Sequence, residues 1–337
     1  MTEIYLTNYI GILHEAVYAT DIIDPANTTH YMIGKLTQPA GDLIREVLSF
    51  QPFWFDSFQI GQIVITNSVA QGDPILFDPV NCYPWRFVFT VPVTDTDISE
   101  AAGVFTITPV ITGERSSFTM RTDHGNSSEN IRDHFVGCLI TDYSESMLFA
   151  TGMERLKASI TYRGLRRVAP ASDVSNPPIF PNSTSNRYKK DTNTVLTWDG
   201  DSMLPEIISF RWGVQIDFED HPVDIVDQKY FEKITTGNAK PNFDFTIRRA
   251  GGTSKKIRDD FINLSTSGTR KEIVFRIYNS ATEYRQVTLT DCVWNMVPNH
   301  TIDDQKVENI WIITGIAESM SLEFKDGLNK TTFYGIA

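Results

Sequence analysis

The sequence predicts a mainly β protein, built as two tandem antiparallel β-sandwich repeats with one short flanking helix in each. Three pairs of segments indicate the duplication, because they recur in the same order at similar spacing. Residues 46–50 (EVLSF) recur 160 positions later as residues 206–210 (EIISF). Residues 138–140 (CLI) recur 154 positions later as 292–294 (CVW). The third pair consists of glycines 163 positions apart, Gly152 with Gly315 and Gly164 with Gly327.

The composition is that of a globular, acidic protein. The 337 residues suit two domains that each bury a core, and 41% hydrophobic with 21% charged residues excludes a disordered chain. A net charge of -12 argues against a partner held through phosphate contacts, because such binding needs clustered Lys and Arg. The same acidity suits a surface past which nucleic acid moves without being gripped.

The cysteines and the hydropathy predict a soluble protein that is assembled in a cytosol. Cys82, Cys138 and Cys292 have no metal-like spacing, and two of them fall in one of the recurring pairs. We therefore expect small buried core residues in a reducing compartment. The first residues lack the basic start and apolar run of a signal peptide. No apolar stretch approaches 18 residues, so no membrane span is expected.

The first half divides into an arm and a repeat. We expect residues 1–42 to form an N-terminal arm and residues 43–168 to form the first repeat. Residues 46–65 are dense in aromatic and β-branched side chains, which predicts mainly strand. Residues 67–84 are rich in Gly, Asp, Asn and Pro, which predicts a long projecting loop. Further strands are expected at residues 85–91, 104–110, 118–121, 135–141 and 156–162, the last with clean alternation.

A linker and a second repeat follow. Residues 169–195 are rich in Pro, Ser and Asn and predict an inter-repeat linker. Residues 196–337 are expected to form the second repeat, with a projecting loop at 219–241. The best helix candidate is residues 254–262, with Ser254 as N-cap and two apolar residues on one face, Ile257 and Phe261. Strands are expected at residues 271–278, 284–294, 311–314 and 320–324.

One detail disagrees with the repeat. Aligning Gly152 with Gly315 sets the apolar positions 156, 158 and 160 against Ser319, Ser321 and Glu323. A one-residue slip inverts the two faces of a strand, so a bulge or a different gap must intervene.

One cluster could carry chemistry. Asp123-His124 and Asp133-His134 precede Cys138, and a Cys near two His suggests either a nucleophile with its base or a metal site. Against this, residues 123–126 (DHGN) are a turn sequence, and the second repeat has Thr288 before Cys292 in place of His134 before Cys138. We expect a structural role for these residues.

Other candidates are weaker. Paired carboxylates occur at Glu219-Asp220 and Asp303-Asp304, without the alternating pattern of a Ca²⁺ loop. No Gly-rich phosphate loop, Gly-x-Ser-x-Gly elbow or His-Glu-x-x-His helix is present in the sequence. We therefore expect no catalytic residue, no cofactor and no metal, and a protein that is not an enzyme.

The opening of the chain resembles a known family. Residues 9–20 (YIGILHEAVYAT) resemble the Gly-Ile-x-x-Glu-x-x-Tyr-Gly-Thr start common in duplicated tail tube proteins of long-tailed phages, with Ala19 where Gly is usual. The Glu-x-x-Ser-Phe segment at 46–50 is similar to the family's entry strand. Residues 137–140, followed by an alternating strand and Arg163-Gly164, also resemble it.

The resemblance implies a virion structural protein, the major tail tube subunit of a siphovirus-like bacteriophage. In that family the inner sheets of neighbouring domains join into a continuous lining of a lumen. Duplicated members form homotrimeric rings with pseudo-sixfold symmetry, which stack through long loops and terminal arms. The resemblance also implies three partners, a tape measure protein, a tail terminator and tail tip proteins. It implies assembly in the host cytoplasm and a place in the virion tail, where DNA passes the lumen without specific binding during ejection. We expect that lumen to be biased toward Asp and Glu, so that it repels the DNA backbone.

A second hypothesis stays open. The aromatic run Phe53-Trp54-Phe55 could serve a tandem β-sandwich that binds carbohydrate, in a viral receptor-binding or baseplate module. The sequence does not decide between assembly and binding.

Overall fold

In the residues that the computed structural model describes, the chain consists mainly of β-strands with two helices, which confirms the mainly β class. The described residues are 9–15, 31–36, 42–50, 62–71, 74–89, 98–109, 115–125, 130–149, 155–164, 166–168, 188–222, 231–249, 252–267, 270–303 and 306–327. None of the helices within these ranges is long and apolar enough to cross a membrane.

Six strands of the first half close into a ring. The hydrogen-bonded circuit runs through β1, β2, β5, β10, β9 and β8 and returns to β1. Their bounds are β1 Tyr9–His14, β2 Tyr31–Leu36, β5 Ile75–Pro79, β8 Phe118–Gly125, β9 Asn130–Leu148 and β10 Lys157–Gly164. The short β11 (Arg166–Val168) pairs with β9 beside this ring.

The expected N-terminal arm over residues 1–42 is not what the structure shows for β1 and β2. Both strands belong to the closed ring, and Ile10, Ile12 and Ile33 are fully buried in the core. The physical reason is that Ile10 and Ile12, two residues apart, place their side chains on the same face of a strand, and burying that face stabilises the strand in the ring.

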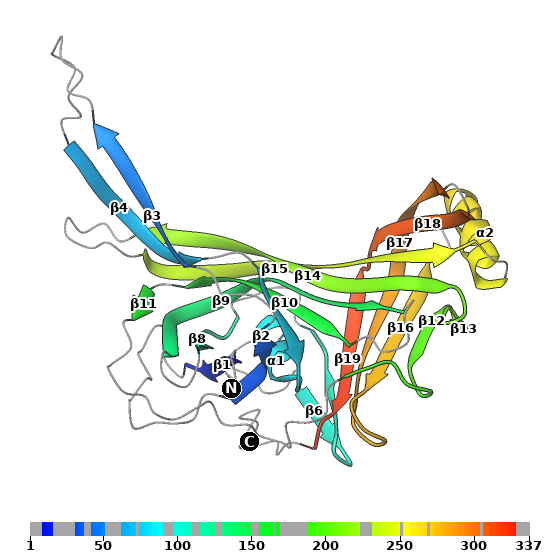
Figure 1. Cartoon of the computed structure of the whole chain (residues 1–337), viewed down its shortest axis with the longest axis horizontal. Coiled ribbons are helices and arrows are strands. Elements are labelled where there is room, and N and C mark those ends of the chain that lie inside the picture. Colours follow the sequence, from blue (N-terminus) through cyan, green and yellow to red (C-terminus); the bar gives the residue numbers. More distant parts are fainter. Residues whose placement is uncertain are drawn as a thin grey trace, which may run out of the picture.

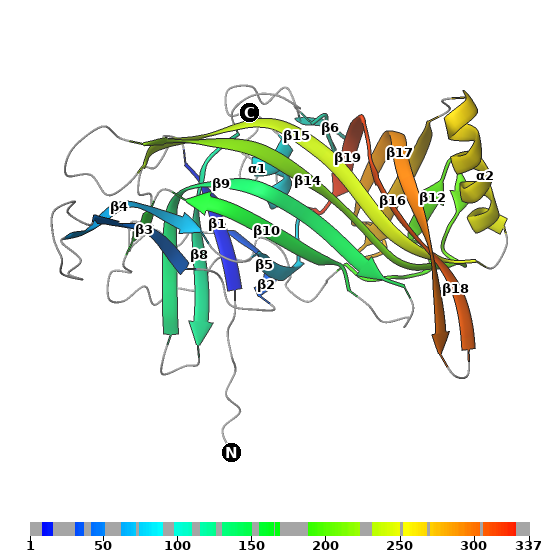
Figure 2. The ribbon, with the colours of Figure 1, turned by 90° about the horizontal axis from the view of Figure 1, so that it is seen from above.

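A second set of strands forms one long sheet through both halves of the chain. Its order is β3, β4, β10, β9, β14, β15, β18, β17. The new bounds are β3 Asp42–Phe50, β4 Gln62–Gln71, β14 Ile207–Pro222, β15 Phe231–Arg248, β17 Tyr284–Asp303 and β18 Lys306–Ile316. In Figure 1, β14 and β15 run across the molecule from left to right, above the closed ring on the left and below β3 and β4. Figure 2 shows these strands side by side with β9 and β10.

A back sheet lies under the long sheet on the side of the second half (Figure 1). Its order is β6, β7, β19, β17, β16, β12, β13, and β17 bends so that its first part belongs here and its last part to the long sheet. The new bounds are β6 Ile98–Ala101, β7 Val104–Ile107, β12 Val195–Trp198, β13 Asp201–Ser202, β16 Lys271–Tyr278 and β19 Ser319–Lys325. Because β6 and β7 come from the first half, the two halves share this sheet and one continuous hydrophobic core.

The two halves have matching irregularities around the cysteines. The β8–β9 register shifts between Phe118 and Met120, and the β16–β17 register shifts between Lys271 and Ile273, 153 positions later. Gly137 and Asp291, 154 positions apart, both have positive φ, at 66° and 56°. Each precedes a fully buried cysteine, Cys138 or Cys292. A bulge marks a specific position in a strand, so matching bulges are what a duplication would produce. The duplication itself stays a prediction.

The β3–β4 and β14–β15 hairpins match as well, at an offset that differs from the 160 positions that the sequence analysis predicts. In β3–β4 the register shifts by one residue after the Glu46–Asn67 pair, and Val47 then pairs with Ile65; in β14–β15 the register shifts in the same sense after Ile216–Ala239, and Phe218 then pairs with Thr236. The two pairs that follow the shifts are 171 positions apart. The sequence alignment of residues 46–50 with 206–210 is therefore wrong for the fold.

The glycine alignment is also wrong. Tyr162 pairs with Ile140 in β10–β9, and Gly315 pairs with Trp294 in β18–β17. Since Ile140 is aligned with Trp294 by the segments around the cysteines, Tyr162 corresponds to Gly315, and β10 corresponds to β18 with an offset of 153. The glycine alignment sets residues 156–160 against residues 319–323 of β19, which lies in the back sheet and is not the strand that corresponds to β10. This accounts for the one-residue phase error without an extra bulge.

The strand expected at residues 85–91 is a helix, α1 (Tyr83–Phe89). Asn81 caps it, because its Oδ1 accepts a hydrogen bond from the backbone N–H of Tyr83 at 3.1 Å. Pro84 fits the first turn, where no N–H is needed. Since nearly every residue of α1 is buried, the apolar run has no polar phase to distinguish helix from strand.

Both expected projecting loops are largely strand. Residues 67–71 belong to β4 and 75–79 to β5, while residues 219–222 and 231–241 extend the β14–β15 hairpin. In the second of these segments, Pro222 ends β14, and Gly237 and Pro241 lie within β15, with Gly237 beside the register shift of that hairpin. Such residues are tolerated at strand ends and bulges.

The helix expected at residues 254–262 is confirmed as part of α2 (Gly252–Ser267), with Ile257 buried and Phe261 packed against the core. Its cap differs. Glu206 accepts the backbone N–H groups of Thr253 and Ser254 at 3.2 and 2.8 Å, so Ser254 is not the N-cap. Of the expected linker 169–195, residues 169–187 lie outside the described ranges, and Val195 already begins β12.

Candidate assembly interface

The two halves meet where β9 pairs with β14, and we call this pairing the internal junction. It runs from Leu148 opposite Ser209 to Asp142 opposite Gln215. Gly213 lies in its middle, where an added Cβ would come within 2.9 Å of the backbone oxygen of Tyr143. The close approach of the strands explains why this position has no side chain.

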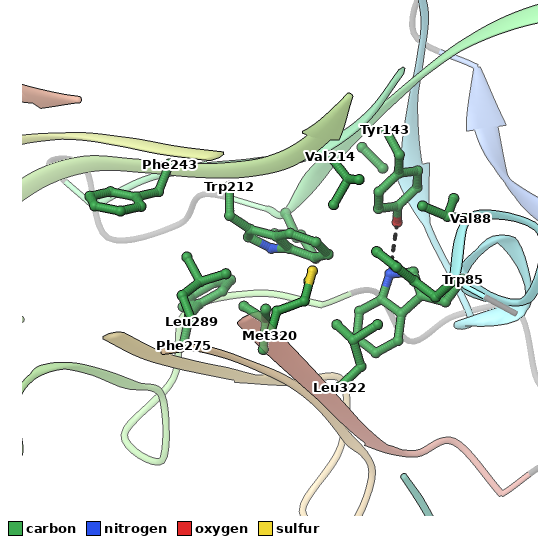
Figure 3. Packing of buried hydrophobic residues seen from close by; sticks show 14 of the residues in the cluster. Trp85, Val88, Tyr143, Trp212, Val214, Phe243, Phe275, Leu289, Met320 and Leu322 are labelled. Carbon is green, nitrogen blue, oxygen red and sulfur yellow. Dashed lines mark hydrogen bonds between the residues drawn. The ribbon is translucent and has the colours of Figure 1, made fainter. Parts of the chain in front are cut away.

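Aromatic side chains fill the buried side of the internal junction. Trp212 of β14 is fully buried and lies 6.0 Å from Trp85, 6.3 Å from Phe89 and 5.9 Å from Tyr143, between ring centroids. Figure 3 shows Trp212 and Tyr143 pointing from the long sheet toward Trp85, with Met320 and Leu322 of β19 below. A strand of the second half is thus covered by a helix and a strand of the first.

A buried ion pair joins the halves. Glu145 of β9 and Arg285 of β17 are each 1% exposed and form a direct salt bridge. The hydroxyl of Tyr143 and the indole N–H of Trp85 both donate to Glu145, at 2.5 and 3.1 Å. Burial and the neighbouring Glu145 raise the pKa of Tyr143 well above its usual value, so the phenol stays a donor.

The guanidinium of Arg285 has further partners. It donates to the backbone oxygen of Asn81 and lies 5.0 Å from the ring of Trp85 and 4.2 Å from that of Tyr188. A buried charge pair is tolerated only when such contacts satisfy it. Because these residues come from α1, β9, β17 and the segment before β12, the cluster fixes how the two halves pack.

The sequence analysis missed this cluster, although a signal existed. Both residues lie on the buried face of their strands. Glu145 alternates with the buried Tyr143 and Met147 in β9, and Arg285 alternates with the buried Val287 in β17. A charged residue in the apolar phase of a strand predicts a buried partner of opposite charge.

The face of the long sheet that points away from the core is here called the open face. At the internal junction it forms a cleft of about 720 Å³ with a partly apolar wall and three cations. The cations are paired: Lys157 and Arg155 lie 2.6 and 3.7 Å from Asp78, and Arg211 lies 3.2 Å from Asp244. The lining residues are Ser146, Met147, Leu148, Arg155, Lys157, Ser209, Phe210, Arg211 and Asp244.

The expected acidic bias is absent from the described part of the open face. This face carries both signs in similar number, and Lys240 pairs with Asp217 at 2.8 Å. Burial raises the pKa of Asp142 above its usual value, and the nearby Arg211 opposes that rise. The charged side chains are Lys157, Arg163, Arg211, Lys240 and Arg248 against Asp142, Asp217, Glu219 and Asp244.

The long sheet ends in two strands with one partner each. Within the described ranges, β3 pairs only with β4, and residues 293–303 of β17 pair only with β18. Each strand therefore presents a row of backbone N–H and C=O groups that can pair with another chain. Exposed apolar residues lie beside the β17 edge, namely Val293 (37% exposed), Ile312 (37%) and Ile316 (61%).

Of the five candidate catalytic residues, Cys138 is the one whose side chain the structure describes. Cys138 is fully buried, and burial raises the pKa of its thiol well above the usual value, which opposes a nucleophilic role. The side chains of Asp123, His124, Asp133 and His134 lie outside the described residues, as do Phe53, Trp54 and Phe55. Glu219 is exposed, and the side chains of Asp220, Asp303 and Asp304 are also outside that set. In the part of the chain that is described, no group of three or more His, Cys, Asp or Glu could hold a metal ion.

The burial of all three cysteines leads to a testable prediction. Burial also raises the pKa of Cys82 beyond its usual range and that of Cys292 to about 12. We expect no reaction of the folded protein with a thiol-specific chromogenic disulfide at pH 8, and reaction of three thiols after denaturation. Rapid labelling of even one thiol in the folded state would contradict the buried positions.

Glu15, the acidic residue of the family-like opening, has a structural role. It is buried and accepts hydrogen bonds from the hydroxyl of Thr119 and the backbone N–H of Gly137, both at 2.9 Å. It therefore holds the bulge in β9 that precedes Cys138.

No protein-family model matches the chain. No curated protein matches it either.

Proposed function

We propose that this chain is a self-assembling structural protein, the major tail tube subunit of a long-tailed virus. Copies would join into trimeric, pseudo-hexameric rings that stack into a conduit for DNA. The observation that carries the proposal is the long sheet, in which four strands of the second half follow the same order of hairpin and partner strands as four strands of the first half, and the internal junction joins the two sets edge to edge.

The strand order makes the internal junction a template for contacts between copies. The first unit runs β3, β4, β10, β9 and the second runs β14, β15, β18, β17, so β3 corresponds to β14 and β9 to β17. The free edge of β17 is thus equivalent to the β9 edge that β14 covers. A second copy that supplies β3 would continue the sheet, and this heterologous contact, repeated with a rotation of one third of a turn per copy, would close a trimeric ring.

The open face would line the conduit. Its side chains are largely polar, and its opposite charges are paired across neighbouring strands. Neutralised cations release few counterions from DNA, so such a wall binds the phosphate backbone weakly. In this proposal DNA moves through the conduit without being bound because the cations of the wall are paired with carboxylates, and not because the lining is acidic.

The oligomeric state tests the proposal. We expect light scattering to show masses in multiples of three chains, and negative-stain electron microscopy to show threefold rings with six-lobed outlines or tubes of such rings. A protein that stays monomeric at every salt and protein concentration would refute the proposal. A glycan screen would then address the carbohydrate-binding alternative.

The charge pairing predicts weak DNA binding. We expect the assembled protein to bind a labelled DNA duplex with a Kd weaker than about 100 µM near physiological salt, because few cations of the open face are free. Fluorescence anisotropy measures this directly. Asp217→Asn and Asp244→Asn together would free Lys240 and Arg211, and we expect this variant to bind more tightly and with stronger salt dependence. Tight binding by the unmodified protein would contradict the neutralised wall.

A further inference from the structure

We infer that the cleft at the internal junction binds a segment of a second protein in which a carboxylate lies beside an apolar side chain. The cleft lies within one chain, so this inference does not depend on the proposed function. It goes beyond that function, because it assigns a partner that self-assembly does not require.

The cleft carries more positive than negative charge. Lys157 and Arg155 lie 2.6 and 3.7 Å from the same carboxylate, that of Asp78, whose side chain is 6% exposed. The third cation, Arg211, has a carboxylate of its own in Asp244, at 3.2 Å. Three cations therefore share two carboxylates. In a chain whose net charge is -12, this local excess of positive charge favours an anionic ligand.

A fourth cation stands next to Arg155. Lys189 is exposed and forms an isolated antiparallel β-bridge with Arg155. Residues directly opposite each other in such a bridge point their side chains to the same face, so Lys189 lies on the side where Arg155 lines the cleft. Its ammonium adds to the excess of positive charge there.

Apolar side chains form another part of the wall. Leu148, the last residue of β9, is 53% exposed, and Met147 and Phe210 also line the cleft. An exposed leucine beside cations suits a ligand that carries an apolar group next to its negative charge. The phosphate backbone of duplex DNA has no such group, so the wall favours protein side chains over nucleic acid.

The openness of the cleft favours a segment of a larger molecule over a free small ligand. Its volume of about 720 Å³ lies in the range of ligand sites, but small ligands bind with about 70–90% of their surface buried. Leu148, Arg155 and Lys157 are each about half exposed, so a free ligand would stay largely in water. Because β9 and β14 pair with each other here, the segment is held by its side chains and not as an added strand.

The second half has an apolar residue at the position equivalent to Lys157. Lys157 pairs with Ser146 and Ile310 pairs with Asn299, and the offset of 153 relates the two pairs. The cation at this position is therefore specific to the internal junction. We expect one segment to bind per chain.

A displayed library of random dodecapeptides tests the inference. The library is selected on the full chain and counter-selected on Leu148→Asp, which places a carboxylate among the cations of the cleft at a half-exposed position. We expect the retained peptides to carry Asp or Glu beside an apolar residue. Fluorescence anisotropy should show one peptide per chain and binding at least tenfold weaker to Leu148→Asp. Lys240→Gln, at an exposed cation of the open face outside the cleft lining, is the matched control and should leave the Kd unchanged.

A charge reversal tests the electrostatic part with a second variant. Arg155→Glu changes a side chain that is 53% exposed, so the fold should tolerate it. We expect it to weaken binding of a retained peptide at least tenfold. A peptide with Lys in place of the acidic residue should bind Arg155→Glu more tightly than it binds the unmodified protein.

The outcomes decide the inference separately from the proposed function. Retained peptides without a carboxylate, or equal binding to Leu148→Asp and to the unmodified protein, overturn it and leave the proposed function standing. A library that yields no peptide overturns it as well. Displacement of the peptide by a DNA duplex would assign the cleft to phosphate and also overturn it. A chain that binds the peptides but never forms rings overturns the proposed function alone.

Discussion

We expect Glu145→Gln to lower the free energy of unfolding by about 3–5 kcal/mol, the loss typical of breaking a buried ion pair from one side. The substitution leaves the guanidinium of Arg285 in a site that is 1% exposed without a negative partner. It also weakens the hydrogen bonds that Tyr143 and Trp85 donate to the carboxylate. Urea denaturation followed by tryptophan fluorescence measures the change.

The loss of unfolding free energy in Glu145→Gln should come mainly from the unpaired charge of Arg285. Glu145→Met combined with Arg285→Met removes both charges, and we expect the double variant to be more stable than Glu145→Gln, because two apolar side chains need no partners. The indole of Trp85 keeps the hydroxyl of Tyr143 as acceptor at 3.1 Å. Lys240→Met, which breaks a pair with both side chains about half exposed, should cost less than about 1 kcal/mol. A loss that small for Glu145→Gln would show that water reaches Arg285.

Sequence reasoning predicted elements whose side chains keep a regular period. The strand at residues 271–278 and the helix at residues 254–262 both present one apolar face, and the structure contains β16 and α2 there. The helix α1 was missed because it is buried on all sides, so its sequence has no period to read. In such a segment the informative signals are local, here Asn81 and Pro84 at the start.

The alignment of the two halves was less predictable. Alternation fixes which face a residue lies on but not its register, so many strand segments resemble one another at incorrect offsets. The pair around Cys138 and Cys292 agrees with the observed irregularities, because each cysteine follows a residue with positive φ, which constrains the position itself. The resemblance of residues 46–50 to 206–210 reflects common strand composition.

The candidate interface could be predicted only in outline. Duplication implied that edges of the repeats would meet, but the sequence did not identify β9 and β14 as the strands involved. Pairing between distant strands depends on bulges and bends, such as the one that sends β17 from the back sheet into the long sheet. The ion pair of Glu145 and Arg285, which are 140 positions apart, likewise follows from that bend.

Trp212→Ala is expected to destabilise both halves together, by about 3–5 kcal/mol. The indole is fully buried, and its aromatic neighbours Trp85, Phe89 and Tyr143 belong to the first half while Trp212 belongs to the second. Removing it leaves a cavity inside a core that both halves share, so neither can retain its packing alone.

The cooperativity of unfolding distinguishes this shared core from two independent domains. We expect one calorimetric transition in the unmodified protein and one transition at lower temperature in Trp212→Ala. Ile262→Ala, at an exposed position of α2, should change the free energy of unfolding by less than about 0.5 kcal/mol. Two transitions, of which only one moves with Trp212→Ala, would mean that the halves fold separately. A single transition would mean that the internal junction is a permanent part of the fold, as a rigid template for the contact between copies requires.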